Sequence, residues 1–144
     1  MIVAQMIRNK PEDTVITIRP DAQISEAAAV LSEKKIGALI VSDTGNSADG
    51  ILSERDIVRE VGRRGAGCLD HPVSELMTAN PVTCSMDTSI ENIMGSMTSG
   101  RFRHMPITDG DTLIGLISIG DVVKARMEEL SHEKEALQDM IMGR

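Results

Sequence analysis

Gly50–Val58 reads GILSERDIV, and Gly115–Val123 reads GLISIGDVV. In both stretches a glycine and apolar residues lead to a serine, and an aspartate follows three positions after that serine. An internal repeat is considered before any other feature, because a repeated unit determines the fold of the whole chain. Working outward from these two stretches, we find that most of the chain is present twice.

The repeat continues on the N-terminal side of both stretches, with the copies 66 residues apart. Asp21 and Ile24 correspond to Asp87 and Ile90, so a polar residue precedes an apolar segment in each copy. The corresponding pairs are Val15–Asp21 with Val82–Asp87, Ile24–Glu26 with Ile90–Asn92, and Ile36–Asp43 with Phe102–Asp109.

Each copy predicts the same order of elements, β-α-β-β-α. A short strand precedes an amphipathic helix, which in the first copy has Ile24, Ala27 and Leu31 on one face. Two apolar strands follow, separated by a turn of Gly, Asp and Asn residues, and a second helix begins at Ser53 or Ser118. The predicted strands are Val15–Ile18, Gly37–Ser42 and Gly50–Leu52, and then Val82–Cys84, His104–Thr108 and Leu113–Ile117. The predicted first helices are Ile24–Lys34 and Ile90–Met97.

The connection between the copies runs from Gly62 to Asn80. Its glycine-rich start, Gly62–Gly67, predicts the end of a helix. Val73–Met77 predicts a single helical turn, and it echoes Val3–Ile7 before the first copy.

Composition limits the function classes. Phe102 is the single aromatic residue and the net charge is -7, so the chain offers little for nucleic-acid bases or phosphates to bind. The two cysteines do not make a disulfide framework, which favours a reducing compartment and predicts a cytoplasmic protein. No apolar run approaches the ~20 residues that span a bilayer, and the N-terminus lacks a signal peptide pattern. We therefore expect neither a nucleic-acid nor a membrane partner.

Motifs for catalysis or metal binding are missing from the sequence. Cys68 and His71 are close in the chain, and Cys84 and His104 could join them, but no paired C-x-x-C spacing supports a zinc site. The glycine-rich connection lacks the Lys-Ser/Thr of a P-loop, and no nucleophile, base and orienting group form a recognisable set. We therefore predict no metal, no catalytic cofactor and no enzyme activity.

The repeat resembles the CBS domain, which occurs in tandem as a Bateman module. The residues that carry the resemblance are Val73–Thr83, Arg103–Ile107 and Gly115–Asp121, together with Ile51–Val58 in the first copy. The resemblance implies an α/β fold of two tandem β-α-β-β-α repeats with pseudo-two-fold symmetry, plus an extended C-terminal helix. We place CBS domain 1 at residues 1–66, a linker at 67–80, CBS domain 2 at 81–127 and the C-terminal helix extension at 128–144.

The resemblance also implies a ligand. CBS pairs bind adenosyl ligands (AMP, ADP, ATP, S-adenosylmethionine, NAD or NADH) in a cleft between the copies. In that family the aspartate of a Ser/Thr-x-x-Asp motif binds the ribose hydroxyls, which gives this role to Asp56 and Asp121 and places Ser53 and Ser118 near ribose or phosphate. The implied function is a regulatory sensor that signals to an effector protein in trans. The alternative is a structural or oligomerisation module that binds no ligand.

The residues themselves allow two interpretations of each Ser-x-x-Asp motif. A carboxylate accepts hydrogen bonds from both hydroxyls of a ribose, and the N-terminus of the following helix favours a nearby phosphate. Equally, Ser53 with Asp56 and Ser118 with Asp121 fit a helix-capping pattern, in which the serine is the N-cap. The two interpretations are compatible.

Basic residues distinguish the second copy. Arg103 and His104, followed by Met105 and Pro106, begin a strand and offer donors to phosphate oxygens, although a solvated strand edge is the alternative. The first copy has Gly37 and Ala38 at the positions of Arg103 and His104, and it has Arg55 where the second copy has Gly120. The two clefts are therefore predicted to differ, and the small Gly120 leaves room for a ligand larger than AMP.

Adenine needs an apolar slot, for which the candidates are Ile16, Ala38, Ile40, Val82, Met105 and Ile107, although a core residue is the alternative for each. Thr17 and Thr83 lie on the matching first strands and are candidates for ligand contact or ordinary strand residues.

The C-terminal segment carries its own pattern. Apolar residues recur at spacings of 4-3-4-3-4, as in a heptad repeat with one lysine in it, although a frayed polar tail is the alternative. The residues of this series are Val123, Met127, Leu130, Lys134, Leu137 and Ile141. The resemblance implies a homodimer, because single CBS pairs commonly associate through their helices, and we expect the C-terminal helix to add a contact that would not hold the dimer alone.

Overall fold

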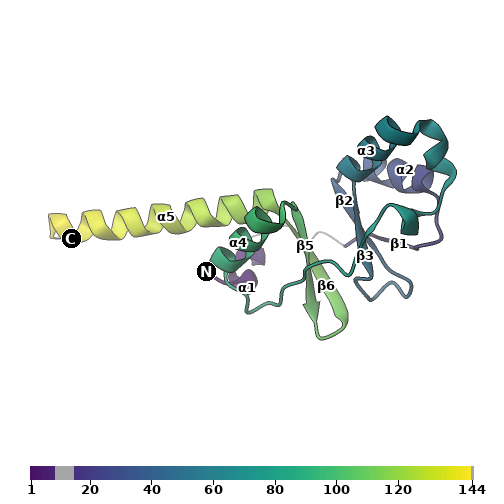
Figure 1. Cartoon of the computed structure of the whole chain (residues 1–144). Helices are drawn as coiled ribbons and strands as arrows, with labels where there is room; N and C mark the ends of the chain where they lie inside the picture. Colours follow the sequence, from purple (N-terminus) through teal and green to yellow (C-terminus); the bar gives the residue numbers. More distant parts are fainter. Residues whose placement is uncertain (9–14, 144) are drawn as a thin grey trace. The chain divides into compact units, whose positions relative to one another are not determined.

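The structure is a computed structural model that describes residues 1–8 and 15–143 (Figure 1). Residues 9–14 of the first predicted domain and residue 144 of the predicted extension lie outside the described residues. The described chain forms two compact units. We call residues 15–83 and 106–116 the repeat-one unit, and residues 1–8, 84–105 and 117–143 the repeat-two unit.

The order of elements agrees with the predicted α/β class, including the extended C-terminal helix. The helices are α1 (Val3–Ile7), α2 (Ile24–Lys34), α3 (Glu54–Arg64), α4 (Ile90–Gly100) and α5 (Ile119–Met142), with 3₁₀ turns η1 (Ala66–Asp70) and η2 (Val73–Glu75). The strands are β1 (Thr17–Ile18), β2 (Ala38–Val41), β3 (Gly50–Ser53), β4 (Thr78–Ala79), β5 (His104–Asp109) and β6 (Thr112–Ser118).

The repeat-one unit is built on a four-stranded sheet with the order β1-β2-β3-β4. Strand β1 runs parallel to β2, and β3 is antiparallel to both β2 and β4. Helix α2 packs on this sheet through Ile24, Ala27 and Leu31, which are buried as the helical spacing predicts. Leu39 and Leu52, which face each other across β2 and β3, are fully buried in the same core.

The repeat-two unit is mainly helical. Ile90, Ile93 and Met97 are buried on α4, and Val122 and Ala125 are buried on α5. Helices α4 and α5 lie against each other, and α1 contacts α5. The β5–β6 hairpin connects α4 to α5, and the boundary between the two units runs through it.

The prediction of a strand at Val82–Cys84 is wrong. Of these residues Cys84 alone takes part in an isolated bridge, and Val82 is 52% exposed. The preceding Pro81 has no N–H to donate to a strand ladder, which disfavours a strand that starts there. The unpredicted β4 instead pairs with β3, so among the described residues the second copy begins its regular structure at α4.

The predicted echo between Val3–Ile7 and Val73–Met77 is confirmed, since the first forms α1 and the second begins with η2. Each segment pairs with the start of a helix. In the repeat-one unit the Val73 N–H donates to the Ala22 carbonyl at 2.7 Å. In the repeat-two unit the Val3 N–H donates to the Thr88 carbonyl at 3.0 Å. Thus the N-terminal segment completes the second copy, and the segment between the copies completes the first.

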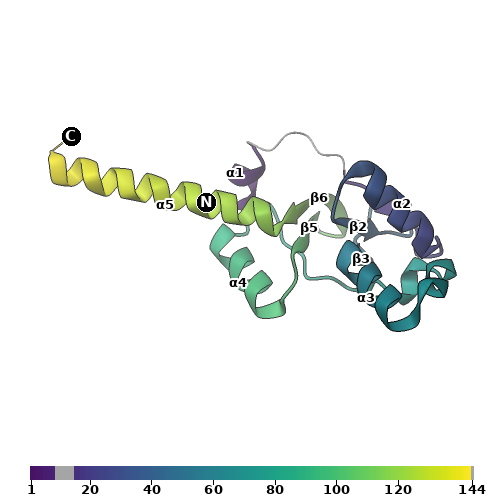
Figure 2. The ribbon, with the colours of Figure 1, turned by 90° about the horizontal axis from the view of Figure 1, so that it is seen from above.

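Helix α5 joins the closing helix of the second copy and the C-terminal extension into one helix of 24 residues. Figures 1 and 2 show its C-terminal half extending beyond α1 and α4. Among the described residues, no helix combines the length and the apolar character needed to cross a bilayer.

Candidate functional site

The first Ser-x-x-Asp motif forms a complete capping box at the start of α3. The Asp56 N–H donates to Ser53 Oγ at 3.2 Å, and the Ser53 N–H donates to Asp56 Oδ2 at 2.9 Å. A guanidinium nitrogen of Arg59 lies 2.9 Å from the other carboxylate oxygen, Asp56 Oδ1. Both oxygens of Asp56 are therefore engaged within the protein.

The second motif repeats the capping box at the start of α5. The Asp121 N–H donates to Ser118 Oγ at 3.2 Å, and the Ser118 N–H donates to Asp121 Oδ2 at 3.0 Å. The position three residues after the aspartate holds Lys124, where the first motif has Arg59. The capping interpretation is thus confirmed for both motifs, and it leaves ligand binding as a prediction.

A shared backbone contact aligns the two motifs. The Glu54 N–H, directly after Ser53, donates to the Gly37 carbonyl at 2.9 Å. The Ile119 N–H, directly after Ser118, donates to the Arg103 carbonyl at 2.8 Å. The structure therefore places Arg103 beside the second motif in the way that Gly37 lies beside the first, and only the second copy has a cation there.

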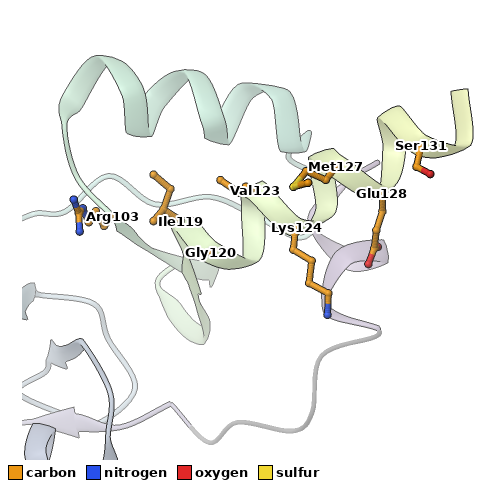
Figure 3. A pocket seen from close by; sticks show the side chains of 8 residues that line it. All are labelled: Arg103, Ile119, Gly120, Val123, Lys124, Met127, Glu128 and Ser131. Atoms are coloured by element: carbon orange, nitrogen blue, oxygen red, sulfur yellow. The ribbon is translucent and has the colours of Figure 1, made fainter. Parts of the chain in front are cut away.

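An open groove lies at the start of α5, and we call it the α5 groove (Figure 3). It encloses about 670 Å³. Its lining residues are Arg103, Ile119, Gly120, Val123, Lys124 and Met127, and it extends to Glu128 and Ser131. In Figure 3, Lys124 and Glu128 extend from a different side of α5 than Ile119 and Val123. Within the described part of the chain, the charged groups of Arg103 and Lys124 form no ion pair, so an anionic group could bind there.

The remaining candidates are divided between the two units. Ala38 is opposite Ser53 in the β2–β3 register, so an apolar residue lies next to the first motif. Thr17 is on β1, and the Ile16 carbonyl accepts the Ile40 N–H at 3.3 Å. Arg55 is exposed on α3, at the position that Gly120 takes in the second copy.

In the second copy, Met105 and Pro106 are buried on β5, and His104 is half-buried at its start. Val82 and Thr83 are exposed and lie outside any strand, so Thr83 does not share the strand position of Thr17 that the repeat predicts. The sequence analysis predicted a ligand cleft between the two copies. Because its candidate residues belong to two separate units, that cleft stays a prediction.

Sequence reasoning missed two residues of these sites, Arg59 and Lys124. Helical spacing could have found them, because the third residue after each aspartate returns to the same face of the helix. Arg59 binds its aspartate, whereas Lys124 lines the α5 groove.

The cysteines have the buried surroundings that the sequence suggested, since Cys68 is 2% and Cys84 7% exposed. Burial raises the pKa of the Cys84 thiol from 9.0 to about 11. Among residues 1–8 and 15–143, no three His, Cys, Asp or Glu side chains gather as a metal site would require.

Comparison with known proteins gives consistent matches. The family model of the CBS domain matches residues 5–63 and 73–128. The crystal structure of the CBS-domain containing protein ATU1752 from Agrobacterium tumefaciens is 44% identical, with a TM-score of 0.81, over 88% of this chain and 99% of that one. The CBS domain-containing protein YhcV of Bacillus subtilis is 31% identical over 81% of this chain and 82% of YhcV.

A third match is the crystal structure of CBSX2 in complex with AMP, which is 25% identical with a TM-score of 0.72, over 88% of this chain and 96% of that one. Several curated relatives from Arabidopsis thaliana are longer, and the chain spans 62% of one of them and 24% of another.

Proposed function

Because the chain belongs to the CBS domain family, we propose that it is a regulatory module that binds an adenosine nucleotide through its second Ser-x-x-Asp motif. The observation that carries this proposal is the arrangement around Ser118 and Asp121. Arg103 adjoins the motif through the Ile119–Arg103 backbone hydrogen bond, and Lys124 is one helical turn further along α5. In this proposal Asp121 accepts the ribose hydroxyls, and Arg103 and Lys124, which both line the α5 groove, provide the cations for phosphate oxygens.

The first motif is less suited to binding a nucleotide. Arg59 already occupies Asp56 Oδ1, and Gly37 replaces the cation that Arg103 provides in the second copy. A ribose would have to displace the Arg59 guanidinium before it reached the carboxylate. Because the cation that Arg103 adds lies beside the second motif only, we propose that the two motifs differ in affinity and that the second is occupied first.

Adenosine is the ligand class that the relatives favour, since CBSX2 was crystallised with AMP. The exposed Gly120 beside the second motif leaves space for ADP, ATP, NAD or NADH as well as AMP. Binding would shift the equilibrium between conformations of the module, which an effector protein in trans would detect. The proposal includes a homodimer in the cytoplasm and assigns no chemical reaction to the chain.

A second candidate function is a structural or oligomerisation module. The complete capping boxes at Ser53 and Ser118 favour it, because they give both aspartates a role without a ligand.

Thermal unfolding distinguishes the two functions. The purified protein is melted with AMP, ADP, ATP, NAD, NADH and S-adenosylmethionine, alongside Asp121→Asn and its matched control Asp56→Asn. A ligand at about 100 times its dissociation constant adds about 2.7 kcal/mol, which raises the melting temperature by several degrees. We expect one ligand to raise it in the wild type and in Asp56→Asn, and the rise to disappear in Asp121→Asn. If the rise in melting temperature disappeared in Asp56→Asn alone, the first motif would be the binding site instead of the second. If no ligand raised the melting temperature of the wild type, the structural function would be favoured.

A further inference from the structure

The α5 groove is lined by a carboxylate, that of Glu128, as well as by its two cations. Glu128 is four residues after Lys124 on α5, about 6 Å further along the helix axis. Figure 3 shows that both side chains extend from the same side of the helix. The groove therefore carries positive charge at Arg103 and Lys124 and negative charge at Glu128, further from the second Ser-x-x-Asp motif.

The Glu128 carboxylate is available to a molecule in the groove. Among residues 1–8 and 15–143 it has no ion pair and no hydrogen-bond partner, whereas the adjacent Glu129 lies 2.8 Å from Arg126. A lysine four residues before a glutamate is the less favourable order for an ion pair on a helix, which is the order of Lys124 and Glu128. Both side chains are exposed, so both can interact with a ligand that enters the groove.

The position of Glu128 matters for a nucleotide that binds as proposed above, and the inference rests on that proposed function. With the ribose at Asp121, the first phosphate would lie near Arg103, because the Arg103 carbonyl accepts the Ile119 N–H at 2.8 Å next to the motif. The second phosphate would lie near Lys124, one helical turn further along the groove. A third phosphate would continue in the same direction and come beside Glu128.

Like charges then oppose the third phosphate. A terminal phosphate carries about −1.5 to −2 charges at neutral pH, and it would meet a carboxylate where the first two phosphates meet cations. We propose that Glu128 is a specificity-determining residue that limits the ligands of the second motif to nucleotides with one or two phosphates. Gly120 leaves space for a longer ligand, but the charge of Glu128 makes a third phosphate unfavourable there.

Calorimetric titration of the full chain with AMP, ADP and ATP tests this selectivity. The titrations contain EDTA, so that no divalent cation neutralises the terminal phosphate or bridges it to Glu128. Because the groove is open and water screens its charges, we expect the wild type to bind ATP about five times more weakly than ADP. Glu128→Gln keeps the size of the side chain and removes its charge, and it should abolish most of this difference.

Two further variants separate the position of the charge from its presence on α5. Glu133→Gln makes the same change of charge at an exposed residue that does not line the groove, and it should keep the preference for ADP over ATP. Glu128→Asp keeps the carboxylate and should also keep the preference. Circular dichroism and thermal melting confirm that each variant is folded.

The outcomes distinguish this inference from the proposed function. If none of the three nucleotides bound the wild type, or if ADP still bound to Asp121→Asn, nucleotide binding at the second motif would be overturned together with the role of Glu128. If the wild type bound ADP and ATP equally, or if Glu128→Gln strengthened both by the same factor, the selectivity would be wrong and nucleotide binding would stand. Equal effects of Glu128→Gln and Glu133→Gln would assign the preference to the overall charge of α5, which would also overturn the role of Glu128.

Discussion

Arg59 holds the aspartate of the first Ser-x-x-Asp motif. Its guanidinium lies 2.9 Å from Asp56 Oδ1, the oxygen that a ribose hydroxyl would otherwise use. We predict that Arg59→Ala opens the first motif, so that calorimetric titration with the preferred nucleotide gains a second, weaker site per chain. The surface pair itself contributes little to stability, and the melting temperature of the free protein should change by no more than about 2 °C. Unchanged stoichiometry would contradict the view that Arg59 blocks this motif.

Cys84 is a residue whose chemistry follows from burial. Its pKa of about 11 means that the thiol stays protonated at neutral pH, so iodoacetamide should label it slowly in the native protein and fast in urea. The unfolded chain can deprotonate this thiol near pH 9 while the folded chain cannot. The contribution of this thiol to the unfolding free energy is therefore complete below pH 9 and declines as the pH rises through about 11. Fast labelling at pH 7.5, mapped to Cys84 by mass spectrometry, would contradict this prediction.

Two glycines test what helices and strands require. In α3, a Cβ added at Gly62 has no atom within 4 Å, so Gly62→Ala should stabilise the helix by about 0.5–1 kcal/mol. In β3, a Cβ added at Gly50 would lie 2.5 Å from Met77 Sδ and 3.2 Å from the Thr78 carbonyl oxygen. Gly50→Ala should therefore destabilise the protein by about 1–3 kcal/mol, since the Met77 side chain must be displaced and the Thr78 carbonyl must shift slightly. Urea unfolding measures the change in unfolding free energy for both variants. If both changes had the same sign, the packing described around Gly50 would be contradicted.

The elements also show which signals in the sequence were sufficient. The bounds of α2 agree with the prediction because apolar residues at helical spacing reach a core and the chain leaves the helix at Lys35, which adopts φ 55°. The strand predicted at Val82–Cys84 failed because apolar character alone does not supply a partner strand. Strand β4 was missed because it is short and both of its residues, Thr78 and Ala79, are exposed. Its pairing with β3 is a contact between segments far apart in the sequence, which no local pattern predicts.

The candidate site shows the same division. The capping boxes could be predicted from the spacing of Ser53 with Asp56 and of Ser118 with Asp121, because that geometry is local. The contact of Arg59 with Asp56 also lies within one helical turn and was overlooked. By contrast, the groove that joins Arg103 to α5 depends on tertiary packing. The repeat indicated the correspondence of Arg103 with Gly37, but not the groove itself.

At the scale of the whole molecule, the segment that completes each copy lies next to the other copy in the sequence. Helix α1 precedes the first copy but packs in the repeat-two unit, and η2 precedes the second copy but packs in the repeat-one unit. Val3 and Val73 are both fully buried, and each donates its N–H to the chain just before a long helix, at Thr88 before α4 and at Ala22 before α2. A chain cut between the repeats would therefore separate the second copy from α1, although α1 is first in sequence. The integrity of the repeat-two unit thus depends on residues that precede the first copy.

Substitution of the two valines tests this organisation. Val3→Ala and Val73→Ala each leave a cavity, and each should cost about 2 kcal/mol of unfolding free energy. Native-state hydrogen exchange measured by mass spectrometry resolves where protection is lost. We expect Val3→Ala to lower protection in α4 and the first half of α5, and Val73→Ala to lower it in α2 and α3. Loss in α2 on substitution of Val3 would contradict the assignment of α1 to the second copy. An equal loss in both units would show that they unfold as one cooperative block, in which case the segment exchange would couple the two copies instead of stabilising each one separately.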